Sequence, residues 1–282
     1  DMDGTLLDGQ SQISHRNIKA IHQLAEHGIE FAIASGRDYE GVYSLIHPFD
    51  IKCEAILGNG AQYVDRDGNV ILSCYMNKDV FKDVISIFEK ANIPFMVFTT
   101  DGFYTTQEPT YVRDSFITRN IKKFNIPKED YIKGGKREFV PSNLLQKINN
   151  VDEFLKRDLE IIKVEAFSLN PEEIIVAKDK LVPIQTISFL SSFNDNVEVT
   201  NEYAQKGLIL EKVIEIKGIK KEEVVVIGDG MNDITLFKCF DNSYAPSNAE
   251  EEIKNLASLI VSDCEEDAVA DVIEVILNGL GN

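Results

Sequence analysis

The chain lacks the residue patterns that mark disulfide frameworks, zinc sites and membrane spans. Its four cysteines lie far apart and form no CxxC pair, which favours reduced thiols over a disulfide or zinc framework. The four histidines show no metal-ligand spacing, and there is no run of about 18 apolar residues. No signal peptide is visible either. We therefore expect a cytoplasmic protein that does not interact with membranes.

Positive charge is also scarce. The 29 lysines and arginines are outnumbered by 47 aspartates and glutamates, so the net charge is −18. A surface of this sign disfavours nucleic acid and anionic membranes as partners. The length of 282 residues suits two domains, and a hydrophobic content of 44% is ordinary for a globular protein with a core. We expect a small molecule as the partner, and a monomer or weak homodimer.

Both ends of the chain alternate short apolar runs with helical patterns. Residues 29–34 and 53–57 predict buried strands, and residues 14–28 predict a helix before the first of them. The same rhythm returns after residue 200, with a helix over 206–217 and an apolar run over 224–227. This alternation is typical of an α/β fold with a Rossmann-like parallel-sheet core.

The middle of the chain has a different pattern. Asp101-Gly102 lies between two strand-like runs and predicts a tight hairpin, and residues 187–200 predict another. Hairpins mixed with helices indicate an α+β unit inserted into the first domain. We therefore predict core segments at 1–77 and 201–282, with an inserted cap domain at 78–200.

The chain opens with DMDGTLLD, in which Asp1 and Asp3 are one residue apart. Two neighbouring carboxylates are stabilised by a cation between them. A carboxylate is a suitable nucleophile for phosphorus, and Asp3 could protonate the leaving alcohol and then activate water. A solvated acidic turn is the alternative. A calcium loop of the EF-hand type is disfavoured, because Leu6 and Gln12 occupy its glycine and glutamate positions.

Two shorter motifs are ambiguous when taken alone. Ser35 and Gly36 follow a predicted strand and could bind phosphate at a helix start, or Ser35 could simply cap that helix. Arg37 could contact substrate or brace a neighbouring acid. Lys206 could neutralise a phosphate at the start of another helix, although most single lysines lie on the surface.

The motif GDGMND, residues 228–233, follows the apolar run 224–227. Asp229 and Asp233 are four residues apart, so they lie on one face at the opening of a helix. Together with Asp1 they would satisfy Mg²⁺, which binds few carboxylates and keeps several waters. The alternative is acid capping of the helix. Asn59, in GNGA, could line a crevice between the domains or make the turn into a hairpin, and we favour the turn.

In chain order, the motifs DMDGTLLD, ASGR, LGNGA, QKG, GDGMND and APSNAEEEIKNLA resemble those of the haloacid dehalogenase superfamily. The resemblance spans nearly the whole chain and points to the Cof-type sugar-phosphatase subfamily with a large C2-type cap. It implies a Mg²⁺-dependent phosphatase that acts on a small phosphorylated metabolite through a phospho-aspartate intermediate.

The resemblance also implies a role for each matching residue. Asp1 would be the nucleophile and a magnesium ligand, and Asp3 the general acid/base, binding the metal through its backbone carbonyl. The remaining residues would bind the metal or the phosphoryl group: Asp229 and Asp233 for the metal, and Ser35, Lys206, Asn232 and the backbone amides of Met2 and Gly36 for the phosphoryl group.

The chain departs from the family pattern in three places. An apolar strand normally precedes the first aspartate, so we expect the printed sequence to begin inside a longer chain. Pro246 and Ser247 replace Met-Gly beside the site, where they could alter a loop. Ala268 stands where the family often has glycine, and we expect only a local change at a helix start there.

Two other functions remain open from the sequence. A phosphomutase would use the same aspartyl phosphate, and a non-catalytic sensor of phosphorylated metabolites could have the same fold. Substrate specificity is expected on the cap, at residues such as Arg113, Arg119, Lys136 or Glu165.

Overall fold

The computed structural model describes residues 1–124 and 144–280. The chain forms two compact units: unit 1 comprises residues 1–73 and 203–282, and unit 2 comprises residues 74–202. Unit 2 is slightly longer than the predicted insertion, 78–200. The reason lies at its two ends, where the backbone amide of Met76 donates to Ile161 and that of Glu202 donates to Thr186, both within unit 2.

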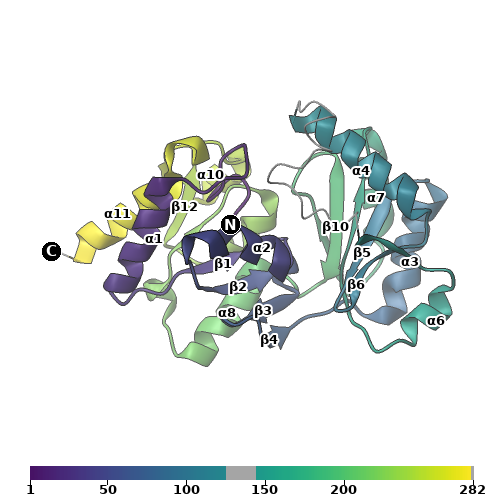
Figure 1. The fold of residues 1–282 in the computed structure, drawn as a ribbon, viewed down its shortest axis with the longest axis horizontal. Helices are drawn as coiled ribbons and strands as arrows, with labels where there is room; N and C mark the ends of the chain where they lie inside the picture. The colour runs from purple at the N-terminus through teal and green to yellow at the C-terminus, as the bar shows by residue number, and fades with distance from the viewer. Residues whose placement is uncertain (125–143, 281–282) are drawn as a thin grey trace. The chain divides into compact units, whose positions relative to one another are not determined.

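The first sheet of unit 1 begins with two parallel strands and ends with a hairpin (Figure 1). Its order is β1 (Ala32–Ala34), β2 (Glu54–Leu57), β3 (Gln62–Val64) and β4 (Val70–Ser73). The β1–β2 pair is parallel, β3 pairs antiparallel with β2, and β4 pairs antiparallel with β3. The hairpin turn includes Gly68 at φ +85°, a backbone conformation that favours glycine.

The second sheet of unit 1 is parallel throughout. It consists of β11 (Val226–Ile227), β12 (Ser243–Pro246) and β13 (Leu259–Val261), in that order. The strands alternate with helices α9 (Ile234–Cys239) and α10 (Glu251–Leu256). Helix α8 (Lys206–Lys217) precedes this sheet in the chain and packs on α9.

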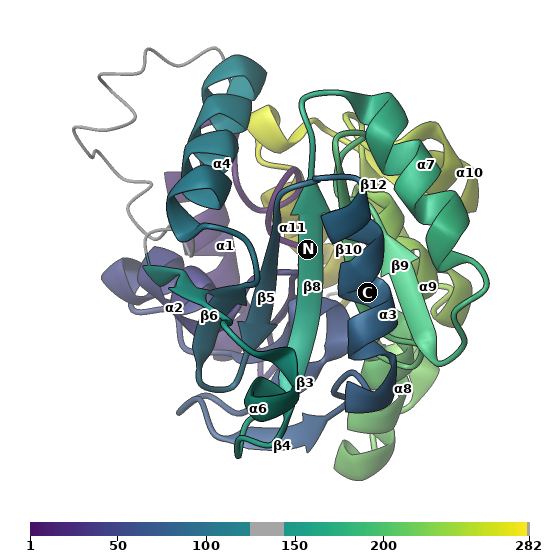
Figure 2. The ribbon, with the colours of Figure 1, turned by 90° about the vertical axis from the view of Figure 1, so that its right-hand side faces the viewer.

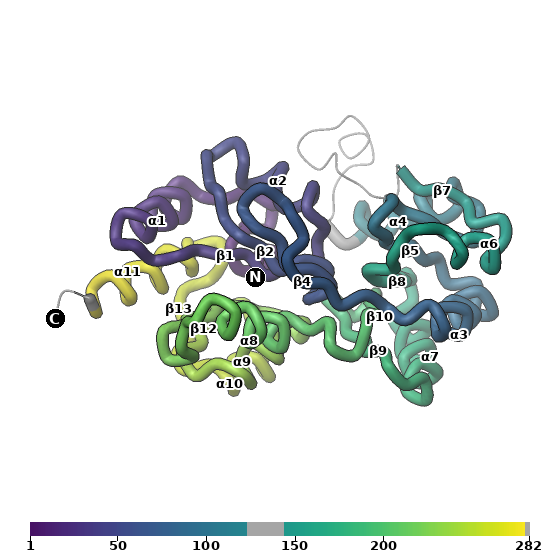
Figure 3. Tube along the Cα trace, turned by 90° about the horizontal axis from the view of Figure 1, so that it is seen from below, coloured from purple at the N-terminus to yellow at the C-terminus, as the bar shows by residue number. Residues whose placement is uncertain are grey.

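Helices α1 (His15–Glu26) and α11 (Ala268–Leu280) lie side by side in unit 1 (Figures 1 and 3). The hydroxyl of Ser14 accepts from the backbone amide of Asn17 at 3.0 Å and so caps α1. The buried Asn17 side chain accepts in turn from the amide of Ala270 at 2.9 Å, joining the two helices. The other helical segments that the structure describes in unit 1 are α2 (Tyr39–Ile46) and the 3₁₀ turns η1 (His47–Phe49), η2 (Gly58–Gly60), η4 (Lys221–Glu223), η5 (Met231–Asp233) and η6 (Cys264–Glu266).

Unit 2 is built on one large sheet. Within the described part of the chain its order is β7-β6-β5-β8-β10-β9, and every pair except the parallel β6–β7 is antiparallel. The strands are β5 (Phe95–Thr99), β6 (Gly102–Thr105), β7 (Gln146–Lys147), β8 (Ile161–Phe167), β9 (Ile187–Leu190) and β10 (Asn196–Asn201). The hairpins predicted at Asp101-Gly102 and over 187–200 are the β5–β6 and β9–β10 pairs.

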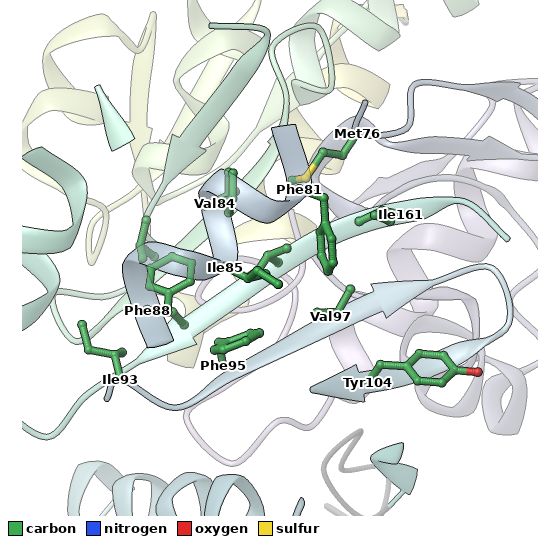
Figure 4. Packing of buried hydrophobic residues seen from close by; sticks show 14 of the residues in the cluster. Met76, Phe81, Val84, Ile85, Phe88, Ile93, Phe95, Val97, Tyr104 and Ile161 are labelled. Carbon is green, nitrogen blue, oxygen red and sulfur yellow. The ribbon is translucent and has the colours of Figure 1, made fainter. Parts of the chain in front are cut away.

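Helices α3 (Lys78–Lys90) and α7 (Pro171–Leu181) cover one face of this sheet (Figure 2). Phe88 of α3 packs on Phe95 of the sheet, Phe81 lies nearer Ile161 and Val97, and both α3 side chains are fully buried (Figure 4). Burying a side chain of this size contributes roughly 1.5–3 kcal/mol, so this layer accounts for much of the stability of unit 2. Unit 2 also contains α4 (Pro109–Phe124) and α6 (Val151–Leu155).

Among the described residues, no helix combines the length and the apolar character needed to span a bilayer.

Candidate active site

The predicted site loops follow strands of unit 1. Ser35 comes directly after β1, Asn59 follows β2, and Asp229 follows β11. The backbone nitrogen of Asp1 donates to the carbonyl of Ile227 at 2.8 Å, which places Asp1 beside the end of β11. Polar groups thus gather at the carboxyl ends of the strands, where α/β folds bind their ligands.

Lys206 joins two of the predicted carboxylates. Its ammonium nitrogen lies 2.6 Å from Oδ1 of Asp1 and 2.7 Å from Oδ1 of Asp233. Lys206 is fully buried at the first position of α8, so the alternative of a solvent-exposed lysine is wrong. A buried ammonium needs anionic partners, and here one of them is the candidate nucleophile.

Asp233 organises the loop that contains Asp229. Its Oδ2 accepts from the backbone amides of Asp229 at 3.1 Å and Gly230 at 3.2 Å, while Oδ1 receives Lys206. A Cβ at Gly228 would lie 2.5 Å from Cγ of Asp233, so glycine allows this close approach. Asp233 is therefore fixed at the centre of the motif and is fully buried.

Asp229 lies in surroundings that disfavour its charge. Burial and the nearby charge of Asp233 raise the pKa of Asp229 to about 7, while Thr5 and Lys206 act in the opposite direction. The Thr5 hydroxyl donates to Oδ1 of Asp229 at 2.7 Å. When the pKa of a carboxyl group is raised in this way, an added cation stabilises its ionised form.

One carboxylate oxygen from each of Asp1, Asp229 and Asp233 lies within 4.8 Å of the others. Lys206 bonds Asp1 and Asp233, and the four side chains sum to a formal charge of −2 when all are ionised. A hard divalent cation with oxygen ligands matches both the charge and the donor atoms. These residues therefore fit Mg²⁺. The cluster does not include the carboxylate of Asp3, and metal binding by the backbone carbonyl of Asp3 stays a prediction.

The side chain of Asp3 points instead to Arg37. Nε of Arg37 donates to Oδ2 of Asp3 at 2.8 Å, and Nη2 donates to Oδ1 at 2.6 Å. Of the two roles predicted for Arg37, the structure shows the contact with a neighbouring acid. The backbone carbonyl of Met2, beside Asp3, accepts from the amides of Leu6 at 3.0 Å and Leu7 at 2.9 Å.

Asn59, predicted to line a crevice or to make a turn, bonds two of the predicted phosphate-binding residues, Ser35 and Asn232. Its backbone amide donates to the carbonyl of Ser35 at 3.0 Å, and its Oδ1 accepts from Nδ2 of Asn232 at 3.4 Å. A Cβ on Gly36 would lie 2.9 Å from the same oxygen, so glycine leaves room for the amide. Asn59 also makes the turn we favoured, at φ +59° within η2. Its side chain is nevertheless buried among site loops.

Several contacts at the site were not predicted from the sequence. Thr5 bonds Asp229, and Nδ2 of Asn248 donates to the carbonyl of Gly4 at 2.8 Å. A Cβ at Gly60 would lie 2.6 Å from the backbone nitrogen of Gln205, so the GNGA turn packs against the start of α8. Thr5 stands inside the motif DMDGTLLD and Asn248 inside APSNAEEEIKNLA, and a polar side chain within each motif was the available signal.

The structure describes both departures from the family pattern near the carboxyl end. Pro246 ends β12, and the amide of Ser247 donates to the carbonyl of Ser262 at 3.2 Å. Ala268 begins α11, directly after Asp267 at φ +69°. The changes expected in the loop and at the helix start stay predictions.

The cap residues predicted to set specificity have partners within unit 2. Arg119 is 5% exposed and forms a two-point ion pair with Asp195. Arg113 pairs with its neighbour Asp114 at 3.4 Å, and Glu165 lies 3.5 Å from the Lys163 ammonium. Lys136 lies outside the described residues. Their role in specificity stays a prediction.

The family model for haloacid dehalogenase-like hydrolases matches residues 1–273. The chain belongs to this family. It is 27% identical over 281 residues to phosphatase YwpJ of Bacillus subtilis, with 98% of each chain covered. It is also 27% identical over 282 residues to 5-amino-6-(5-phospho-D-ribitylamino)uracil phosphatase YwtE of the same bacterium, covering 99% of this chain and 97% of the relative.

The fold comparison agrees with the family assignment. The structure of a haloacid dehalogenase-like hydrolase from B. subtilis matches with a TM-score of 0.84 at 26% identity, covering 97% of both chains. The predicted Cof-type resemblance, the α/β core with an inserted cap and the enzyme class, a phosphoric monoester hydrolase, are confirmed.

Proposed function

We propose that this haloacid dehalogenase-like hydrolase is a Mg²⁺-dependent phosphatase that acts on small phosphorylated metabolites through a phospho-Asp1 intermediate. The observation that carries the proposal is the Lys206 ammonium, 2.6 Å from Asp1 and 2.7 Å from Asp233, beside Asp229. An arrangement of three acids and one buried lysine suits a dianionic phosphoryl group only when a divalent cation is added.

Asp1, Asp229 and Asp233 would hold Mg²⁺, with the backbone carbonyl of Asp3. When bound, the ion offsets negative charge on the carboxylates and the phosphoryl group, so that the two anions can approach.

In the first step, a carboxylate oxygen of Asp1 attacks phosphorus while the bond to the substrate oxygen breaks. Asp3 gives a proton to the departing alkoxide. Lys206 holds Asp1 in place, and Ser35, Asn232 and the amides of Met2 and Gly36 are proposed to orient the phosphoryl group.

In the second step, Asp3 takes a proton from water, and the water oxygen attacks the phosphorus of phospho-Asp1. The bond between phosphorus and Asp1 breaks, releasing inorganic phosphate and restoring both side chains. Positioning and charge neutralisation supply most of the catalysis in phosphoryl transfer.

We further propose that the partner is a small metabolite and not nucleic acid, and that the enzyme acts in the cytoplasm as a monomer or weak homodimer. The net charge of −18 and the four free cysteines support this. Substrates worth testing include phosphorylated sugars and phosphorylated ribityl-uracil compounds, because the relative YwtE is named for the latter.

The test is phosphate release from a panel of sugar phosphates, nucleotides and cofactor phosphates. Each substrate is run with Mg²⁺, with a chelator, and with the Asp1→Asn variant. Release that requires both Mg²⁺ and Asp1 is the expected result. Turnover by Asp1→Asn equal to the parent would contradict the mechanism.

Two other results would point to the remaining functions. Transfer that requires a bisphosphate activator and releases little phosphate would identify a phosphomutase. Tight ligand binding without turnover would identify a sensor.

A further inference from the structure

We infer that Arg37 is a positioning residue that fixes the orientation of the Asp3 carboxylate for proton transfer. The inference rests on the proposed function, in which Asp3 serves as the general acid/base. Arg37 need not touch the substrate to act in this way.

The contact between Arg37 and Asp3 determines an orientation as well as a distance. Nε and Nη2 of Arg37 donate to the two different oxygens of Asp3, at 2.8 and 2.6 Å. Two parallel hydrogen bonds from a planar guanidinium hold a carboxylate in one plane. A lysine offers a single point charge on a flexible stem, so it would leave the carboxylate free to rotate.

Arg37 is itself anchored at its backbone. Its amide donates to Oγ of Ser35 at 3.2 Å, and its carbonyl accepts from the amide of Gly58 at 3.0 Å. The next residue, Asp38, caps α2 by accepting from Gly41 at 2.9 Å. The guanidinium therefore extends from a backbone held by β1, the turn after β2 and a helix start.

The loop that carries Asp3 is anchored on both sides. The carbonyl of Met2 accepts from the Leu6 amide at 3.0 Å, and the carbonyl of Gly4 accepts from Asn248 at 2.8 Å. The Thr5 hydroxyl bonds Asp229 at 2.7 Å. With the backbone held, the torsions of the Asp3 side chain are what Arg37 can still restrict.

The Arg37–Asp3 pair is a weak candidate for a purely stabilising contact. The side chains are 32% and 47% exposed, and ion pairs at such exposure contribute little to folding. The orientation of the Asp3 side chain matters for catalysis, because a general acid must lie within hydrogen-bond reach of the leaving oxygen. We therefore expect Arg37 to matter for the rate and hardly at all for stability.

The test compares two substrates that differ in their need for an acid. An alkyl phosphate releases an alkoxide that requires a proton, whereas p-nitrophenyl phosphate releases a stable phenolate without one. Release of the alcohol or of p-nitrophenol is followed in a single turnover with enzyme in excess, so that only the first step is measured, and steady-state rates with substrate in excess give KM. The variants are Arg37→Lys and Arg37→Ala.

The control is Arg16→Lys. Arg16 is similarly exposed at 40% and likewise pairs with two carboxylate oxygens, from Asp271 and Glu274, but it lies between α1 and α11. Asp3→Asn serves as the reference for complete loss of the acid. Thermal unfolding of every variant shows that the fold is retained.

For Arg37→Lys we expect alcohol release from the alkyl phosphate to fall about 10- to 100-fold with little change in KM. Release of p-nitrophenol should fall less than about threefold, because that step does not use the acid. Asp3→Asn should lose more activity on the alkyl phosphate than on p-nitrophenyl phosphate, and by a larger factor than Arg37→Lys does. A double variant that combines Arg37→Lys with Asp3→Asn should be no slower than Asp3→Asn alone. Arg16→Lys should match the parent on both substrates.

Equal losses on the two substrates together with a raised KM would overturn the inference and make Arg37 a substrate-binding residue. Parent-like rates in Arg37→Lys and Arg37→Ala would overturn it as well. In both cases Asp3→Asn would still show its leaving-group preference, so the proposed function would survive. If the parent released no phosphate from any substrate, the proposed function would fail and the inference with it.

Discussion

The ammonium of Lys206 lies 2.7 Å from Oδ1 of Asp233, and both side chains are fully buried. The pair has no solvent to compensate for the loss of either charge. Asp233 also receives two backbone amides, so it supports the loop as well as the lysine. The same lysine contacts the candidate nucleophile Asp1, which makes the stability of this pair a condition for the site.

Asp233→Ala should therefore destabilise the protein strongly. Removing one partner of a buried pair costs up to about 3–5 kcal/mol. Lys206 would keep Asp1 as a partner, but the amides of Asp229 and Gly230 would lose their acceptor. Urea unfolding would measure the change in the free energy of unfolding. A loss under about 1 kcal/mol would show that Asp1 alone compensates the Lys206 charge or that Lys206 loses its proton.

Mg²⁺ should stabilise the protein more at pH 8 than at pH 5. The pKa of Asp229 is raised to about 7, so without metal the folded state retains a proton that the unfolded state has already lost. Stability in a chelator should accordingly fall as the pH rises from about 4 to 7, because the folded state binds more protons over this range. Ionising Asp229 in the folded state lowers stability, and this loss is largest above pH 7. The added cation removes the loss, so its stabilising effect is also largest there.

Thermal unfolding in chelator and in Mg²⁺ at the two pH values measures this effect. Asp229→Asn is the matched variant, since its amide does not titrate. The same pH dependence of stability in Asp229→Asn and in the parent would contradict the assignment to Asp229.

Gly207→Ala should disrupt the packing of α8 on α9. A Cβ at this position would lie 2.2 Å from the backbone carbonyl oxygen of Thr235, which cannot move aside as a side chain can. Forcing extra volume into such a contact costs about 1–3 kcal/mol. Because Gly207 follows Lys206, activity should also fall.

Gly279→Ala is the control for this substitution. Gly279 lies in α11, has open space around its Cβ position and does not have a positive φ. Alanine there should be neutral or stabilising by up to about 1 kcal/mol. Equal stability of the two alanine variants would argue against the close helix contact.

Arg119→Ala should destabilise unit 2. The Arg119 guanidinium is 5% exposed, forms a two-point ion pair with Asp195 and lies 5.8 Å from the centre of the Phe167 ring. Loss of this buried partner should cost about 3–5 kcal/mol in the free energy of unfolding. Arg113→Ala, whose side chain is 42% exposed, should change stability by less than about 0.5 kcal/mol. Chemical denaturation of both variants measures these changes. A large loss in Arg119→Ala would show a structural role for Arg119, and no loss would leave substrate binding as its role.

Elements with strong local signals could be predicted from the sequence. Ser14 caps α1 as expected, and the Asp101-Gly102 turn joins β5 to β6. The motif loops were also placed correctly at strand ends, because the alternation of apolar runs and helices determines where each loop falls. These features depend on residues close together in the chain.

Contacts between distant residues could not be predicted in this way. The Thr5–Asp229 bond joins residues 224 positions apart, and the Arg119–Asp195 pair joins residues 76 apart. Arginine on a cap helix is compatible with substrate binding or with a buried pair. Only the three-dimensional position of Asp195 shows that the pair is formed.

The division of the chain has a consequence for its synthesis. Unit 2 is a continuous segment, residues 74–202, and can make all its internal contacts before any of residues 203–282 leave the ribosome. Unit 1 is discontinuous, and the Asp1–Lys206 pair spans 205 positions. Until Lys206 and the loop that ends at Asp233 have been translated, Asp1 lacks both its cation and the other carboxylates. The catalytic centre can therefore assemble only after the whole cap segment has been translated.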